Sequence, residues 1–248
     1  MKFKLYKTVL LVIAFTMGNA SILQAKNNGY LLTAKVSQNN VKSDVEKAII
    51  NGVNTPGQAK PIPVISAEPS ISSSNHSIGL ALSKTLRMSQ FSLFNIPLSD
   101  KKLDSLFVNY GIFYDHLKYN NFANNKYNLT INSRYGVNAS LGHDINEKFS
   151  IYYGLSYASV DYEVDSRSIA FAGGNNGTEN NRKTSPINSL GLSYKLSGGF
   201  QLALEYSRQK IELEASTYSS ITDETQVLEE YNFDTEIESF SFNVSKRF

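Results

Sequence analysis

Few side chains in this sequence have the types and spacing that catalysis or metal binding requires. Three histidines, His76, His116 and His143, lie far apart in the chain, and there is no cysteine. Zinc sites need clustered His or Cys ligands, so we expect no metal site. Ser77 follows His76 directly, but neighbours on a strand point to opposite faces, which argues against a nucleophile and its base. We therefore expect no catalytic residue and no cofactor.

A second set of polar residues is predicted to be structural. Asp115 and Arg134 lie near the ends of two segments in which apolar and polar residues alternate, and both belong to the polar face. We expect them to pair, directly or through a network that includes Lys35 and Glu205. The alternative is that these charges are exposed in loops.

The elements that carry these residues have a period of two, which indicates β-strands. The pattern is clearest at the end of the chain, where Phe240, Phe242, Val244 and Phe248 share one face and serines, an asparagine and an arginine share the other. Similar runs occur at 29–37, 76–86, 106–119, 134–145, 149–164, 187–196, 200–214 and 237–248. The sequence therefore predicts about eight strands.

The connections between these segments alternate in length. Three residues each, 146–148 and 197–199, form tight hairpin turns. We predict long polar loops at 38–75, 121–133, 165–186 and 215–236. An even strand count with alternating short and long connections is typical of up-and-down membrane barrels. The segment 86–105 does not fit a short turn, and it is either an excursion or contains a further strand. Whether 26–75 supplies the first strand is also open.

The two tight turns fix the pairing of their strands. A three-residue loop at 197–199 places Leu192 opposite Leu204, whereas a loop of two residues would mix apolar and polar faces. A similar loop at 146–148 places Leu141 opposite Tyr153. The pattern therefore predicts the register of both hairpins as well as the presence of their strands.

The N-terminus has the pattern of a secretory signal peptide. Lys2, Lys4 and Lys7 precede an apolar run of about ten residues, and small residues follow, with Ala20 and Ala25 as candidate cleavage sites. An uncleaved anchor is the alternative. We expect the signal peptide to cover 1–25 and the barrel to cover 26–248.

Two further features separate a membrane barrel from a soluble β-sandwich. The polar face of the strands is rich in Gly, Ser and Asn, which suits a narrow barrel interior better than a soluble core. Aromatic residues lie toward the ends of the apolar face, where membrane interfaces are expected. The net charge is only +2, so no nucleic-acid partner is expected.

With these patterns in place, the sequence resembles bacterial outer-membrane β-barrel proteins of the eight-stranded opacity, OmpX and OmpA-barrel group. The resemblance is carried by the layout of the strands and by residues 237–248, which end in Phe with alternating apolar residues upstream. Lys246 stands where an aromatic residue is usual. The resemblance implies that the barrel assembly machinery recognises Phe240, Phe242, Val244 and Phe248.

The expected fold is thus an all-β, closed, antiparallel transmembrane barrel in the bacterial outer membrane. The leading functional hypothesis is a non-enzymatic surface protein, with a barrel that anchors loops for adhesion or for contact with host or envelope proteins. The alternatives are a narrow porin and, less favoured, a lipid-modifying enzyme. The sequence names no ligand.

Overall fold

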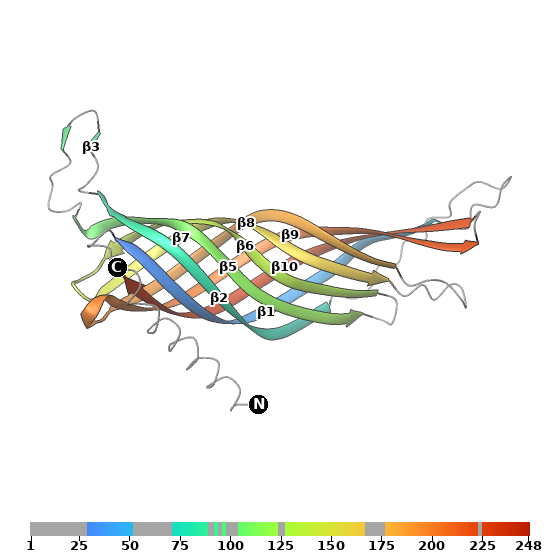
Figure 1. Cartoon of the computed structure of the whole chain (residues 1–248), viewed down its shortest axis with the longest axis horizontal. Coiled ribbons are helices and arrows are strands. Elements are labelled where there is room, and N and C mark those ends of the chain that lie inside the picture. The colour runs from blue at the N-terminus through green and yellow to red at the C-terminus, as the bar shows by residue number, and fades with distance from the viewer. Residues whose placement is uncertain are drawn as a thin grey trace, which may run out of the picture.

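The computed structural model describes residues 29–51, 71–88, 92–93, 96–97, 104–123, 127–166, 177–222 and 225–248. They form a closed antiparallel barrel with the strand order β1-β10-β9-β8-β7-β6-β5-β2 (Figure 1). Its strands are β1 (Tyr30–Asn51), β2 (Ile71–Arg87), β5 (Leu106–Ala123), β6 (Tyr127–Asp144), β7 (Phe149–Ser166), β8 (Gly177–Lys195), β9 (Phe200–Thr222) and β10 (Thr225–Arg247). The prediction of a closed, eight-stranded, antiparallel barrel is confirmed.

The structure also answers two questions that the sequence left open. The first barrel strand is β1, which pairs with both β2 and β10 and so closes the barrel. The segment between β2 and β5 contains β3 (Ser92–Leu93) and β4 (Ile96–Pro97), which pair only with each other. It is therefore an excursion from the barrel. The predicted signal peptide, 1–25, lies outside the described residues.

The register of both tight hairpins follows the sequence pattern. Leu192 is opposite Leu204 across the 197–199 turn, and Leu141 is opposite Tyr153 across the 146–148 turn. Gly198 and Gly199 adopt positive φ angles of 71° and 78°, which glycine tolerates without steric cost. These two turns, together with the C-terminal end of β10, define what we call the turn end of the barrel.

The predicted long loops are wrong in their bounds, because the strands run much further away from the turn end than the pattern indicated. The ranges 38–75, 121–133, 165–186 and 215–236 each contain paired strand residues. For example, β10 begins at Thr225 rather than at 237, and β1 ends at Asn51 rather than at 37. Figure 1 shows β9 and β10 projecting furthest, with the end of β1 beside them.

The outer surface next to the turn end is apolar. Large hydrophobic side chains face outward there and stay 38% to 59% exposed, although each belongs to a regular, fully paired strand. We call this the apolar belt; it includes Leu80, Leu82, Tyr110, Ile112, Tyr114, Val137, Leu141, Ile151, Tyr153, Leu155, Tyr157, Leu190, Leu192, Leu204, Tyr206, Phe240 and Phe242. On β7 it runs from Phe149 to Tyr157, about the length that a strand needs to cross a bilayer.

Beyond the belt, the two faces of each strand exchange polarity. On β9, Leu204 and Tyr206 face outward in the belt, whereas Lys210 and Glu212 are the exposed residues further along the same face. The inward residues change in the opposite sense, so that Leu213 is fully buried. We call this part of the molecule, beyond the belt, the extended section. Its polarity is that of a protein surrounded by water.

The interior of the extended section is a compact apolar cluster. Its residues come from β1, β9 and β10 on one side and from β5, β6 and β7 on the other. The members are Val41, Leu117, Tyr119, Leu129, Ile131, Val160, Tyr162, Val164, Ile211, Leu213, Ala215, Phe233 and Ile237. We refer to it as the interior apolar cluster.

The barrel wall opens along two seams in the extended section. The ladder between β8 and β9 ends at Ile187 and Gln209, and the ladder between β2 and β5 ends at Ile78 and His116. Pro186 comes next on β8 and has no N–H with which to continue a ladder. Beyond these points two four-stranded sheets, β2-β1-β10-β9 and β5-β6-β7-β8, enclose the interior apolar cluster as in a β-sandwich.

Side chains bridge both seams where the ladders stop. The Tyr162 hydroxyl donates to the Glu214 carbonyl (2.5 Å) and accepts from the Glu214 N–H (3.0 Å). The Asn181 amide donates to the same carbonyl (3.0 Å), and the Asn75 amide donates to the Leu117 carbonyl across the other seam (2.6 Å). These bonds satisfy backbone groups that would otherwise lack partners.

Among the described residues, no helix is long and apolar enough to span a membrane.

The belt predicts where a charge is tolerated. Leu155→Arg, within the belt on β7, should lower the free energy of unfolding in bilayers by up to about 2–4 kcal/mol. Glu163→Arg lies on the same face of the same strand, in the extended section, and should leave stability nearly unchanged. Urea titrations in lipid vesicles, followed by circular dichroism, measure both. Equal effects of the two substitutions would place the membrane boundary elsewhere.

Candidate functional site

The most buried charges of the described residues meet inside the barrel at the inner edge of the extended section. Asp115 on β5 accepts hydrogen bonds from the Arg134 guanidinium, at 2.7 Å from Nη2 and 3.2 Å from Nε. The Lys35 ammonium lies 3.1 Å from the same Asp115 oxygen. Both Asp115 and Arg134 are 1% exposed. One carboxylate is thus held by two cations in a region from which solvent is largely excluded.

Glycine provides the space for this carboxylate. Gly79 on β2 is directly opposite Asp115 in the ladder. A Cβ atom at Gly79 would overlap the Asp115 side chain. Any larger residue at 79 would therefore force the Asp115 carboxylate to move from its present position. This requirement ties the composition of the polar face to the buried ion pair.

The ion pair extends across the barrel through an amide. Arg134 Nη1 donates to the Gln209 side-chain oxygen on β9 (3.3 Å), and Gln209 donates to the Ser185 hydroxyl on β8 (2.9 Å). The network therefore reaches β8 and β9, which flank one seam, close to the point where their ladder ends. We infer that it holds the two sheets together at the start of the extended section.

Glu205 lies elsewhere in the same interior. Its carboxylate accepts a hydrogen bond from the Tyr152 hydroxyl (3.0 Å), and it makes no ion pair with Lys35 or Arg134 in the described part of the chain. The structure thus joins three of the four residues expected in the lumen network and gives the fourth a different partner. Sequence reasoning missed Tyr152, although Gly191 opposite it on β8 is the residue that makes room for its ring.

A cavity of about 130 Å³ lies between these groups. Lys35, Asp115, Arg134 and Glu205 all line it, together with asparagines and serines. The amide oxygen of Asn243 is buried without a protein partner in the described residues. A cavity of this size, with charged and amide groups in its wall, suits a few water molecules. The interior apolar cluster begins on the far side of the buried ion pair and closes the cavity in that direction.

The histidines do not form a site. All three, His76, His116 and His143, are exposed side chains. In the part of the chain that the structure describes, no three His, Asp or Glu side chains are grouped so that they could bind a metal. Ser77 is buried and bound to Asn39 (2.9 Å), whereas His76 is exposed. The two residues therefore lie on opposite faces of β2.

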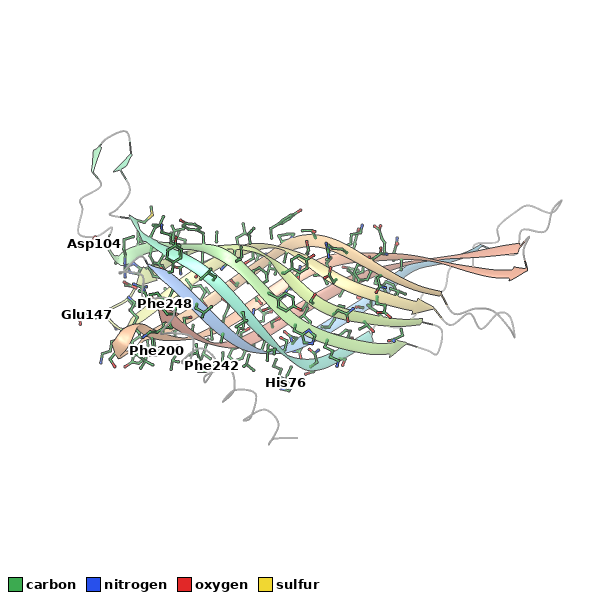
Figure 2. The ribbon with its side chains drawn as sticks, in the orientation of Figure 1. His76, Asp104, Glu147, Phe200, Phe242 and Phe248 are labelled. Atoms are coloured by element: carbon green, nitrogen blue, oxygen red, sulfur yellow. The ribbon has the colours of Figure 1, made fainter. Side chains whose placement is uncertain are left out.

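The residues of the expected assembly signal line the outside of β10. Phe240 and Phe242 belong to the apolar belt, and Val244 follows on the same face. The Phe248 N–H donates to the Tyr30 carbonyl (2.9 Å), which fixes the end of β10 against the start of β1. Figure 2 shows Phe248 near Phe200 at the turn end, with Phe242 further along the barrel. Recognition of these residues by an assembly machinery stays a prediction.

Comparison with known proteins gives structural likeness only. No family model matches the chain, and no curated protein does. Neisserial surface protein A has a TM-score of 0.47 and 12% identity over 89% of this chain and 97% of its own. OprG from Pseudomonas aeruginosa has 0.49 and 12% over 91% and 99%. Ail, the attachment invasion locus protein of Yersinia pestis, has 0.35 and 14% over 87% and 98%.

Likeness at these values carries no functional information, so function has to be inferred from the side chains of this protein. A closed eight-stranded barrel with an outward apolar belt and a polar, closely filled interior is the architecture of an outer-membrane protein.

The buried ion pair gives a stability prediction. Arg134→Met should lower the free energy of unfolding by about 3–5 kcal/mol, because it removes one partner of a buried pair and leaves Asp115 with Lys35 alone. Recovery of much of that loss should require the triple variant Arg134→Met, Asp115→Leu and Lys35→Met, because the double variant would leave the Lys35 ammonium without its anion. Arg182→Gln breaks an exposed pair with Asp161 and should have no measurable effect. Urea unfolding in detergent micelles tests all three, and equal stability of the two single variants would contradict this account.

Proposed function

We propose that this protein is a non-enzymatic surface protein of the bacterial outer membrane. The barrel acts as the anchor, and the extended section contacts host or envelope proteins outside the cell. The observation that carries the proposal is the length of the strands. β9 and β10 have 23 residues each, about twice what a tilted strand needs to cross a bilayer. A protein that only spans the membrane has no use for the second half.

The direction of the extended section follows from the connections. Outer-membrane barrels have short turns on the periplasmic side and longer features outside. The two tight turns, 146–148 and 197–199, lie at the turn end. We therefore place the turn end in the periplasm and the extended section outside the cell.

The outer surface of the extended section suits contact with other macromolecules. It is polar and charged on all sides, with ion pairs between neighbouring strands such as Arg182–Asp161 and Arg208–Glu236. The hydrogen bond from Arg208 holds the pKa of Glu236 below its usual value, so this pair stays ionised in mildly acidic surroundings. A packed two-sheet body of this kind presents the side chains of its strands in a defined arrangement.

An adhesion assay tests the proposal. Cells of a non-adherent strain that express the chain should bind to epithelial cells. Replacing 167–176 by a Gly-Ser linker, together with Arg182→Glu and Lys210→Glu, should reduce that binding severalfold. Deletion of the whole range 165–186 is a poorer test, because it removes part of β8.

The control is Lys148→Gln at the turn end, which should bind as the unmodified chain does. Heat-modifiable migration on gels verifies that every variant is folded in the outer membrane. Full binding by a folded variant of the extended section would contradict the proposal.

The interior argues against the alternative of a narrow porin. A pore needs a continuous path of water, whereas the residues of the interior apolar cluster are at most 4% exposed. We expect planar bilayers that contain the purified chain to show no unitary conductance. Sustained channel openings would favour the porin instead. The control is an unfolded preparation of the same chain, which should show no openings.

A further inference from the structure

Four ionisable side chains converge inside the barrel at the turn end, and none of them belongs to the network around Asp115. They are Arg87 on β2, Asp144 on β6, Lys195 on β8 and Arg247 on β10. Asp144 is the acceptor at the centre. Its Oδ2 atom lies 2.5 Å from Arg87 Nη1, and its Oδ1 atom lies 2.7 Å from Lys195 Nζ and 2.5 Å from the Ser150 hydroxyl.

The carboxylate of Asp144 is therefore fully occupied by two cations and a hydroxyl. Arg247 lies on the inward face of β10, opposite Leu31 at the end of the β1–β10 ladder. It is within electrostatic range of Arg87 and Asp144, yet it makes no ion pair within the described part of the chain. Its side chain is partly buried. Among the described residues, Arg247 is thus a partly buried guanidinium without an ion-pair partner, next to a carboxylate that already binds two other cations. Burial of an uncompensated guanidinium is costly, and a further negative group would relieve the cost.

The geometry around Arg87 is also preorganised. Its guanidinium lies over the Phe107 ring, 5.6 Å from the centroid, and donates to the Asp104 carbonyl (2.9 Å). The Phe107 ring itself fits only because residue 142 is a glycine, since a Cβ atom there would overlap it. A positioned guanidinium loses little freedom when it binds an anion.

We propose that the mouth of the barrel at the turn end binds a phosphate-type anion between Arg247, Arg87 and Lys195. Guanidinium groups bind phosphate oxygens through paired hydrogen bonds, and an ammonium adds a point charge. The same chemistry is available from a dissolved phosphate and from a phospholipid headgroup of the adjacent leaflet. This site is independent of the surface function proposed above, because it lies at the opposite end of the molecule.

Two lysine–aromatic pairs on the outer surface indicate that lipid phosphates lie near the turn end. Lys84 lies over the Tyr30 ring at 5.4 Å, and Lys246 lies over the Phe200 ring at 4.2 Å. Lysine and aromatic side chains at the edge of an apolar belt lie at the level of the lipid headgroups. The mouth is thus bordered on its lipid side by further cations.

The first experiment titrates inorganic phosphate into the full chain, folded in nanodiscs of zwitterionic lipid, with detection of the arginine side-chain Nε–H signals by NMR. The Arg247 signal should shift and saturate. Arg247→Gln should weaken phosphate binding roughly 10- to 100-fold, since it removes charge-assisted hydrogen bonds. Lys148→Gln, which removes an exposed cation of the neighbouring turn, is the matched control and should bind phosphate normally.

Asp144→Asn separates anion binding from a purely structural role. It frees Arg87 and Lys195 from their internal acceptor, so phosphate should bind severalfold more tightly to this variant. A variant that does not fold is recognised by loss of heat-modifiable migration, and Lys195→Gln, which should weaken binding, then takes its place. The proposal is overturned when phosphate leaves the Arg247 signal unmoved, or when Arg247→Gln binds phosphate as tightly as the unmodified chain.

A second set of nanodiscs distinguishes the two sources of the anion. Discs with phosphatidylglycerol supply headgroup phosphates at the rim of the barrel. If a headgroup occupies the site, the Arg247 signal in these discs should already be shifted, and added phosphate should have little effect. If a dissolved anion occupies it, the titration should be the same in both lipids. Either outcome supports the anion site and identifies its source.

Discussion

A β-strand that crosses a bilayer and continues into water must exchange the polarity of its two faces. In lipid the outward side chains have to be apolar, and in water they have to be polar while the inward ones form a core. β9 makes this exchange within a few residues, from Tyr206 outside to Ile211 inside. The rest of the molecule depends on all strands making the exchange at a common level.

The buried charges stand at that level. On the turn-end side of Asp115 and Arg134, the interior is polar and contains a cavity. On the other side it is the interior apolar cluster. A network that links β1, β5, β6, β8 and β9 is well placed to fix the relative heights of the strands, because a shift of one strand would separate donors from acceptors. Such register control is the best attested role of buried polar groups.

The sequence predicted the strands where lipid dictates the pattern, and much less where it does not. In the belt, an uninterrupted alternation such as Phe149 to Tyr157 identifies both the strand and its outward face. Past the belt the apolar residues move to the other face, as in Val41 on β1 and Phe233 on β10. This change of phase resembles the end of a strand, so the sequence pattern predicts loops for most of the extensions of β1 and β10. Nothing local to the sequence marks the level of the membrane.

The candidate sites show the same division. Asp115 and Arg134 share the polar face near the same end of adjacent strands, so their proximity could be inferred from parity alone. The cluster around Asp144 could not, because it depends on how four non-adjacent strands close around one end. Glu205 binds Tyr152 instead of the expected cations for the same reason. Parity places a side chain inside the barrel, but the tilt of the strands determines which residues it contacts.

In the orientation proposed here, the hydrophobic residues of the sandwich must pass through the bilayer before they can pack. Until the strands arrive outside, Leu213, Phe233 and their neighbours lack their final contacts. The burial of these side chains therefore stabilises the protein only after the strands have reached the outside of the cell. Packing of the external body therefore opposes backward slippage of the strands, so that the inserted state is locked in place by a core that lies outside the lipid altogether.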